Sequence, residues 1–265
     1  MGLPMAERLL QAGFDVWGFD VRPIEEFGRF SERMIGDPEQ FTDCVDIVIS
    51  VVRDAVQTSA LLFDDQRLLR LPNHPRVLIT CSTLSPRYLQ EIAAHVPAGV
   101  RFMDAPMSGA PYRARAGNLT FMLGGEPSLV RETRPLFEAM GREIHHLGRF
   151  GHGMTVKVLN NYCAAASVVA TRRVLAMAGA LDVDTDRLLA VMSSSSGGNW
   201  YANNIGDIDW SLEGYAQGNT IGILEKDVRS ALDAIPSETA HEDPGFPRFD
   251  EALLAALAAL EPLER

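Results

Sequence analysis

Two loops in the first half of the chain carry residue types that could bind a charged or hydroxylated ligand. Gly2 stands at the start of an expected helix, and Asp20 follows 18 residues later at the end of an expected strand. In a dinucleotide-binding fold, an acid about 20 residues past the glycine turn binds the ribose hydroxyls. Residues 104–110 follow another expected strand, where Ser108 and Gly109 could present a hydroxyl and a backbone N–H to an anion. Each feature alone is equally compatible with an ordinary turn.

A lysine and an asparagine interrupt an apolar segment in the second half. Lys157 and Asn161 are four residues apart, so they share one face if the segment is helical. Burying either side chain without a partner is costly, so both need a reason to be there. That reason is either a functional site or a bridge to neighbouring elements. Further on, Lys226 precedes Asp227, where a solvent-exposed helix face is the simpler interpretation.

Composition indicates a globular chain with enough apolar residues for two cores. The 265 residues are 46% hydrophobic and 22% charged, which excludes a disordered chain, a collagen-like fibre and a disulfide-framework peptide. The formal net charge of −11 disfavours nucleic acid as a partner, because an acidic surface repels phosphate. Cys44, Cys81 and Cys163 lack metal-ligand spacing and predict reduced thiols in a cytoplasmic protein. No apolar run approaches the ~20 residues that cross a bilayer, so we expect no membrane partner.

The first half alternates between strand-like and helical patterns. Residues 46–52 and 76–80 are continuous apolar runs, which are typical of parallel strands buried on both faces. Further strands are expected at 14–20, 101–105 and 119–124, and helices at 1–12, 31–40, 58–63 and 86–95. This alternation predicts an α/β domain with a doubly wound parallel sheet over residues 1–150.

Residues 151–265 change to an all-helical pattern. Residues 153–180 contain no proline and are rich in Ala, Val and Leu, so we expect one long helix, apolar on all sides and therefore buried. Shorter helices are expected at 184–192, 224–235 and 249–260, with a Pro- and acid-rich loop at 235–249. The glycines within 148–153 mark the expected hinge between the two domains.

Taken in order, these segments resemble the β-hydroxyacid dehydrogenase family, the 3-hydroxyisobutyrate dehydrogenase group related to 6-phosphogluconate dehydrogenase. The similarity covers most of the chain and is strongest from residue 101 to residue 204. It rests on DAPMSGAPYRARAGNLTFMLGG at 104–125, GHGMTVKVLNN at 151–161 and MSSSSGGNWYANN at 192–204. The pairing of DAPxSG with GxGxxxKxxNN is specific. The resemblance implies a Rossmann-type dinucleotide-binding domain followed by a shortened all-α domain for substrate binding and dimerisation.

The resemblance also implies an NAD-linked oxidoreductase that acts on a small 3-hydroxy acid or, in reverse, on its semialdehyde. Lys157 matches the family's catalytic lysine, which exchanges the proton of the substrate hydroxyl while hydride moves to the nicotinamide. Asn161 matches the asparagine that orients this lysine, and Ser108 is the third catalytic position. The substrate-binding positions implied are Ser108, Gly109, Ala110 and Lys226.

The cofactor-binding positions implied are Gly2, Leu3, Asp20, Val52, Thr83 and Lys226. Asp20 favours NAD over NADP, because a carboxylate repels a 2′-phosphate. Arg22 lies two residues on and softens that preference, so NADP is the second candidate. No metal is implied. The family's interlocking helical domains imply a homodimer or a homotetramer.

The sequence departs from the family pattern in three places. Met1-Gly2 matches only the end of GxGxMG, so the first strand of the sheet and the leading glycines of the pyrophosphate site are missing. Residues 235–249 stand where the family has a long helix, and Ala110 stands where glycine is typical. Two explanations remain open. Either the true start lies upstream of Met1, or the chain is a truncated, catalytically impaired relative that acts as a binding or oligomerisation module. An imine reductase within the same fold is disfavoured by Lys157.

Overall fold

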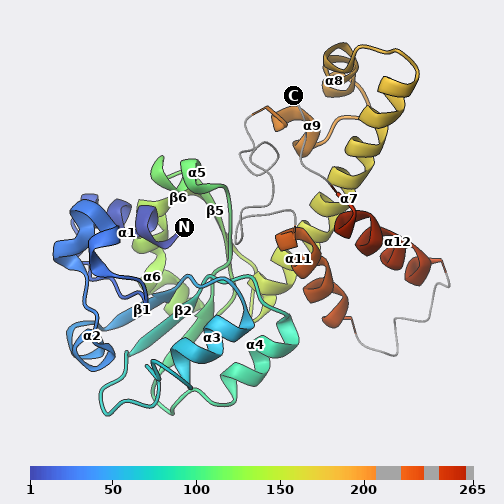
Figure 1. Cartoon of the computed structure of the whole chain (residues 1–265). Coiled ribbons are helices and arrows are strands. Elements are labelled where there is room, and N and C mark those ends of the chain that lie inside the picture. The colour runs from blue at the N-terminus through green and yellow to red at the C-terminus, as the bar shows by residue number, and fades with distance from the viewer. Residues whose placement is uncertain (207–221, 236–244, 261–265) are drawn as a thin grey trace. The chain divides into compact units, whose positions relative to one another are not determined.

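The computed structural model describes residues 1–206, 222–235 and 245–260 (Figure 1). The chain divides into two compact units, Met1–Lys157 and Val158–Arg265, and each is described by itself. The first unit holds two β-sheets, whereas the described residues of the second unit form helices and no strand.

Three parallel strands form the first sheet, in the order β1-β2-β3. They are β1 (Ile47–Ser50), β2 (Val77–Thr80) and β3 (Arg101–Asp104). The middle strand, β2, is buried on both faces, as its unbroken apolar run predicts. Ser50, Thr80 and Asp104 are register partners in the last row of this sheet. Polar side chains therefore gather where the three strands end.

The second sheet is mixed and is joined to the first at the end of β3. β4 (Met107–Ser108) runs antiparallel to β5 (Leu119–Leu123), and β5 runs parallel to β6 (Gly141–His146). The Asp104 N–H donates to the Gly124 carbonyl at 3.0 Å, and the Gly124 N–H donates back to the Asp104 carbonyl at 2.8 Å. The backbone of Asp104 thus belongs to both sheets.

Helices cover both faces of the sheets, so the doubly wound α/β fold is confirmed (Figure 1). Neighbouring residues of β2 point into different cores, since side chains alternate along a strand. Ile79 joins one core and Leu78 the other. The first core contains α1 (Gly2–Gln11), α5 (Pro111–Arg115) and α6 (Pro127–Met140). The second core contains α2 (Pro38–Cys44), α3 (Ala55–Leu62) and α4 (Pro86–Ala93).

The expected strand over 14–20 does not form. Its backbone pairs at a single point, Gly18 with Met34, where the Gly18 N–H donates to the Arg33 carbonyl at 2.8 Å. A strand needs a hydrogen-bonded neighbour along its length. Among the residues that the structure describes, no strand pairs with 14–20 along its length. An apolar pattern by itself cannot show whether such a partner exists.

The expected helix over 31–40 is also wrong. A 3₁₀ helix covers Ile24–Arg33, and α2 starts only at Pro38. The Asp37 side chain accepts the Gln40 N–H at 2.9 Å and caps α2. The local capping residues, which the apolar pattern does not reveal, therefore place the boundary between the two helices.

The second unit is built around a long helix, α7 (His152–Ala180), which begins in the first unit. The shorter helices are α8 (Thr185–Ser193), α9 (Trp200–Asn204), α11 (Gly222–Asp233) and α12 (Phe246–Ala258). Their core joins Ala165 of α7 to Val228 of α11 and Leu253 of α12. Within the expected loop over 235–249, residues 236–244 lie outside the described residues.

The expectation that α7 is buried on all sides is wrong for the described chain. Leu159 is 53% exposed and Met177 is 48% exposed, because α11 and α12 pack against one stripe of the helix. By length and composition alone α7 could also cross a membrane, contrary to the expectation from the length of its apolar runs. A core helix of a soluble protein has the same properties, so they do not by themselves assign α7 to a membrane.

Candidate active site

The ends of the parallel strands place three predicted positions at one edge of the first sheet, the edge where α/β folds bind ligands. Val52 follows β1 and donates its backbone N–H to Ser82 Oγ at 3.1 Å, which joins the loops after β1 and β2. Thr83 is the next residue of the second loop. Gly2 reaches the same edge, since a Cβ added there would lie 3.7 Å from the Val51 Cβ.

The predicted anion-binding loop forms β4 and the turn that follows it. Ser108 pairs with Thr120 of β5 and is half-buried. Gly109 has a φ of +136°, and a Cβ there would lie 2.7 Å from a methyl group of Leu119. Only glycine tolerates both conditions. Ala110 is the N-cap residue of α5.

A carboxylate that the sequence patterns left without a role lies directly beneath this loop. Asp104 ends β3 and is fully buried. Its Oδ1 accepts the Gly151 N–H at 2.7 Å and its Oδ2 accepts the Met154 N–H at 2.6 Å. Burial raises the pKa of Asp104 to about 6, although both hydrogen bonds and the nearby His152 oppose the rise.

The Asp104 carboxylate packs directly against the backbone of two glycines. A Cβ at Gly124 or at Gly153 would lie 2.8 Å from Asp104 Oδ2. On the other side, Met154 Sδ accepts the Leu84 N–H at 3.3 Å, one residue after Thr83. The first turn of α7 is therefore held by both β3 and the loop after β2.

Lys157 lies one turn further along α7 and is 7% exposed. The sequence contains two lysines among its 24 lysine and arginine residues. Arginine stays protonated in proteins, whereas a lysine amine can gain and lose a proton. The chain thus uses lysine at the two positions that the family pattern marks and arginine everywhere else.

The other predicted polar side chains lie in the second unit around a second buried carboxylate. Asn161 Nδ2 donates to Asp227 Oδ2 at 2.6 Å, and Lys226 Nζ lies 2.9 Å from Asp227 Oδ1. The Asp227 side chain is 3% exposed. It fixes the amide of Asn161 and holds Lys226 on α11. The simpler interpretation of Lys226-Asp227 as a solvent-exposed face is wrong, because Asp227 is a buried partner.

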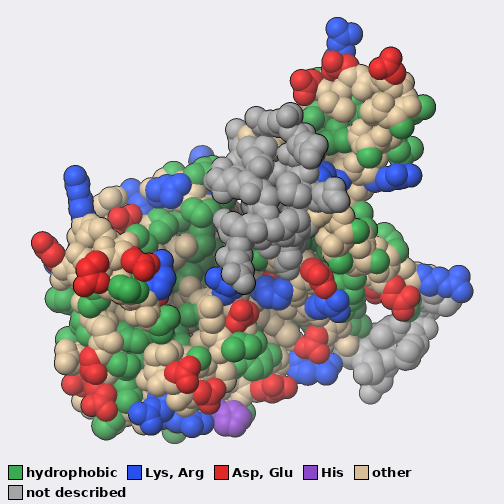
Figure 2. Space-filling model, viewed as in Figure 1, with side chains coloured by type: hydrophobic (Ala, Val, Ile, Leu, Met, Phe, Trp, Pro, Cys, Tyr) green, Lys and Arg blue, Asp and Glu red, His purple; other side chains and the backbone are tan. Residues whose placement is uncertain are grey.

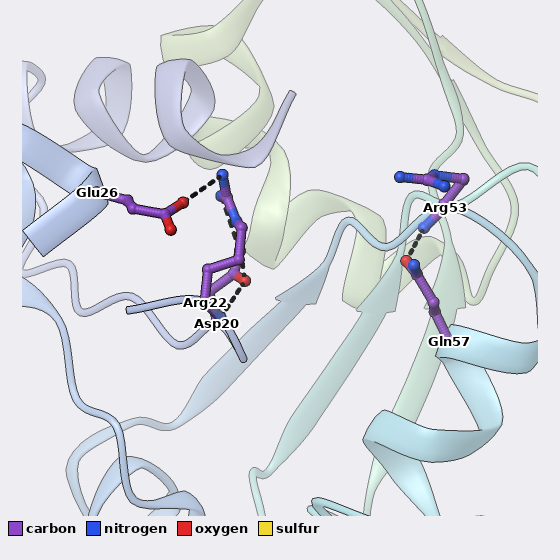
Figure 3. A network of polar contacts seen from close by, with 5 residues as sticks. All are labelled: Asp20, Arg22, Glu26, Arg53 and Gln57. Carbon is purple, nitrogen blue, oxygen red and sulfur yellow. Dashed lines mark hydrogen bonds and ion pairs between the residues drawn. The ribbon is translucent and has the colours of Figure 1, made fainter. Parts of the chain in front are cut away.

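In the first unit, Asp20 belongs to an open network of side chains (Figure 3). Arg22 donates its Nε to Asp20 Oδ1 at 3.2 Å and its Nη2 to Oδ2 at 3.1 Å. Arg22 also lies 3.8 Å from Glu26. Nearby, Arg53 donates its backbone N–H to Gln57 Oε1 at 2.9 Å, so its guanidinium takes no part in that contact.

A cavity of about 520 Å³ opens beside Asp20. It is lined by Phe19, Asp20, Val21, Arg22, Pro23, Ile24, Gly36, Pro38, Asp65 and Gln66. Its size and its mixture of apolar walls with the carboxylates of Asp20 and Asp65 suit a nucleoside with ribose hydroxyls. These residues therefore fit the adenosine end of a dinucleotide. Leu3, in the first turn of α1, is not among them.

No cluster of His, Cys, Asp and Glu suited to a metal ion occurs in residues 1–206, 222–235 and 245–260. The two residues that the sequence patterns missed are Asp104 and Asp227. Both had a signal. Asp104 is an acid at the end of a buried strand, and Asp227 is adjacent to the second lysine.

Comparison with known proteins covers both halves of the chain. Residues 1–148 match the NAD binding domain of 6-phosphogluconate dehydrogenase. Residues 151–241 match the NAD-binding domain of NADP-dependent 3-hydroxyisobutyrate dehydrogenase. These matches confirm NAD or NADP as the cofactor.

Relatives and a solved structure agree. An NAD-dependent L-serine dehydrogenase of Pseudomonas aeruginosa is 37% identical over 206 residues, which cover 76% of this chain and 68% of the relative. A 3-hydroxyisobutyrate dehydrogenase of the same organism is 35% identical over 244 residues, covering 88% and 81%. The structure of the 3-hydroxyisobutyrate dehydrogenase of Mycobacterium tuberculosis with L-serine has a TM-score of 0.77 and 26% identity, covering 100% of this chain and 92% of that one.

Proposed function

The chain belongs to the β-hydroxyacid dehydrogenase family and is an NAD-dependent dehydrogenase, and we propose that its substrate is a small 3-hydroxy acid oxidised with Lys157 as the proton acceptor. L-serine and 3-hydroxyisobutyrate, which relatives of this chain are named for, are both acids of this class. In the reverse direction the substrate is the semialdehyde and Lys157 donates the proton. The nicotinamide, when bound, accepts or returns the hydride.

The proposal gives each catalytic and substrate-binding position one task. The Ser108 hydroxyl and the Gly109 N–H bind the substrate carboxylate, and the Ala110 methyl limits the space beside it. The Lys157 amine takes the proton of the substrate hydroxyl as the oxidised carbon becomes a carbonyl. Asn161, one helical turn along α7, orients that amine.

The cofactor assignment rests on the edge of the sheet and on Asp20. Gly2 and Leu3 supply the helix start at which the phosphates bind. Val52 lines the adenosine side of the cleft, and Thr83 lines its nicotinamide end. Asp20 accepts the ribose hydroxyls and favours NAD over NADP. Lys226 contacts substrate and cofactor as a cation held by Asp227.

Partners and compartment follow from composition. Cys44, Cys81 and Cys163 are all free, which supports a location in the cytoplasm. Acidic and basic side chains are interspersed on the visible face of the first unit (Figure 2), which supports the prediction that nucleic acid is not a partner. We also propose a homodimer or a homotetramer, supported by the family resemblance.

The observation that carries the proposal is the buried lysine at the start of α7, in a chain that has one other lysine, Lys226, and otherwise uses arginine. The test compares Lys157→Arg with Lys226→Arg, since arginine keeps the charge but cannot exchange a proton near neutral pH. NADH formation is followed with NAD⁺ and L-serine or 3-hydroxyisobutyrate. We expect Lys157→Arg to lower kcat by about 100-fold or more and Lys226→Arg to act mainly on KM.

Circular dichroism and a titration of NADH fluorescence show whether each variant folds and binds the cofactor. A second variant, Lys157→Met, covers the case in which the guanidinium does not fit. A Lys157→Arg variant with the turnover of the wild type contradicts the proposed role of the lysine. A folded wild-type chain that neither binds NADH nor turns over any 3-hydroxy acid favours the competing binding or oligomerisation module.

A further inference from the structure

We propose that Asp104 is a positioning residue for Lys157, because it fastens the first turn of α7 to the strand that carries the Ser108 loop. This inference rests on the proposed function, since it assigns the carboxylate a task in placing the lysine. All the groups involved lie in the first unit.

The geometry ties two parts of the site to one residue. The backbone of Asp104 exchanges two hydrogen bonds with the backbone of Gly124. Ser108 follows Asp104 by four residues in the sequence. Through its side chain, it accepts the N–H groups of Gly151 and Met154 at 2.7 and 2.6 Å. The start of α7 and the loop after β3 therefore cannot move apart without breaking two charge-assisted hydrogen bonds.

The surroundings leave the carboxylate no second position. At Gly124 and Gly153, even a methyl group would come within 2.8 Å of Asp104 Oδ2. Real Cβ atoms do not approach so closely. The carboxylate therefore fits only because both neighbouring residues are glycines without a side chain. Close-packed interiors have few voids and low compressibility, so the start of α7 has little room to shift. Catalysis needs such precision, since a 1 Å misplacement can lower a rate about 100-fold.

The two hydrogen bonds that Asp104 accepts from α7 and the residue before it depend on the ionised state of its carboxyl group. A protonated carboxyl group keeps one good acceptor oxygen and presents a hydroxyl to an N–H, so one of the two bonds is lost. The titratable groups that face it are His152 on α7 and Cys81 after β2. Burial raises the pKa of Asp104 to about 6. The neighbouring hydroxyls of Ser50 and Thr80 in the same row of the sheet carry no charge.

The test compares Asp104→Asn with Glu132→Gln in the full chain. Both variants remove a carboxylate that secures one end of β3. Glu132 pairs with Arg101, the first residue of the strand, and with Arg76 at 2.8 Å. The asparagine amide turns one acceptor into a donor that faces an N–H. We expect Asp104→Asn to lower kcat about 100-fold while the Kd for NADH stays within about twofold, and Glu132→Gln to keep kcat within about twofold.

The pH profile separates positioning from a structural role. The profile is measured in the reductive direction, in which Lys157 donates its proton and therefore gives no acid limb of its own. In the wild type, kcat for reduction of the semialdehyde should fall below about pH 6 as Asp104 takes up a proton. In Asp104→Asn this acid limb should be absent. A merely structural role would lower Tm and leave the shape of the profile unchanged. An Asp104→Asn variant with wild-type kcat, or with the acid limb intact, overturns the proposal.

A second measurement on the wild type covers the case in which Asp104→Asn does not fold. The amide proton shifts of Gly151 and Met154, followed by NMR, should titrate together with the acid limb of kcat. Amide shifts that titrate without any change in kcat overturn the proposal. An active Lys157→Arg variant would instead overturn the proposed function, so the two failures are seen in different variants.

Discussion

Two aspartates of the first unit show how differently a carboxylate can be held. The Asp20 side chain is 32% exposed and meets the guanidinium of Arg22, which is 56% exposed. Asp104 is fully buried and meets backbone N–H groups of α7. An exposed ion pair is screened by water and its side chains can rotate, so it exchanges partners at little cost. A buried carboxylate with backbone partners has no such freedom.

The difference matches the tasks proposed for the two residues. Asp20 must give up Arg22 whenever ribose hydroxyls arrive, so a weak and open contact is an advantage. Asp104 must keep α7 in place through every turnover. The raised pKa of Asp104 shows that burial costs its charged form more than the hydrogen bonds return. The fold therefore gives up stability near neutral pH to keep this carboxylate ionised.

The largest effect is expected from filling the space beside Asp104. Gly153→Ala places a methyl group 2.8 Å from Asp104 Oδ2 and even closer to the Met122 carbonyl. We expect a loss of about 3 kcal/mol in the free energy of unfolding, together with most of the activity. Gly179→Ala on the same helix is the matched control, because nothing lies within 4 Å of its added methyl group. It should gain about 0.5–1 kcal/mol. Urea unfolding measures both, and equal effects would contradict this account.

The next effect is a pH dependence of stability. The unfolded chain releases the Asp104 proton near pH 3.8, whereas the folded chain keeps it to about pH 6. Between these values the native state binds more protons, so this contribution to stability falls as the pH rises and is constant above pH 6. The wild type should lose up to ~3 kcal/mol relative to Asp104→Asn between about pH 4 and pH 7. Parallel urea curves of the two proteins at several pH values measure this loss, and a constant difference between them would refute it.

A smaller effect is expected at the open carboxylate. Asp20→Ser removes the charge that repels a 2′-phosphate and leaves Arg22 free to pair with it. The ratio of kcat/KM for NADP⁺ to that for NAD⁺ should rise by about 10-fold or more, and Arg22→Ala in the same background should reverse the gain. Glu26→Gln is the control, since Glu26 touches the network only through Arg22 at 3.8 Å. An unchanged ratio would remove Asp20 from the ribose site.

The smallest effect concerns the polar row beside Asp104. Ser50 Oγ and Thr80 Oγ1 are buried and have no hydrogen-bond partner within the described ranges. An unsatisfied buried hydroxyl costs free energy, so replacement by an apolar group of the same shape is neutral or stabilising. Thr80→Val should therefore raise the free energy of unfolding by less than about 1 kcal/mol. A clear loss in thermal unfolding would mean that the hydroxyl has a partner after all.

Much of the fold could be predicted from local pattern. The apolar runs of β1 and β2 and the alternation with α3 and α4 depend on burial of a few consecutive residues, which a sequence displays directly. The segment 14–20 shows the limit of this approach. It has a strand-like composition, but its state depends on a hydrogen-bonded neighbour elsewhere in the chain.

The candidate site divides in the same way. Lys157, Asn161 and Ser108 stand in motifs that can be recognised by spacing, and the structure places them on α7 and β4. Asp104 and Asp227 act through contacts with residues 47 to 66 positions away, and no spacing rule reveals these. The exposure of α7 was missed for a related reason, because composition does not say how much of a helix its neighbours cover.

The most direct test of the central claim is chemical rescue of Lys157→Ala by small primary amines. The account predicts that the variant binds NADH, has little activity, and regains turnover in proportion to the amine concentration. The rescued rate should depend on amine basicity as expected for general acid–base catalysis. If Lys157→Ala binds cofactor and keeps the turnover of the wild type without any amine, Lys157 is not the proton acceptor and the account is wrong.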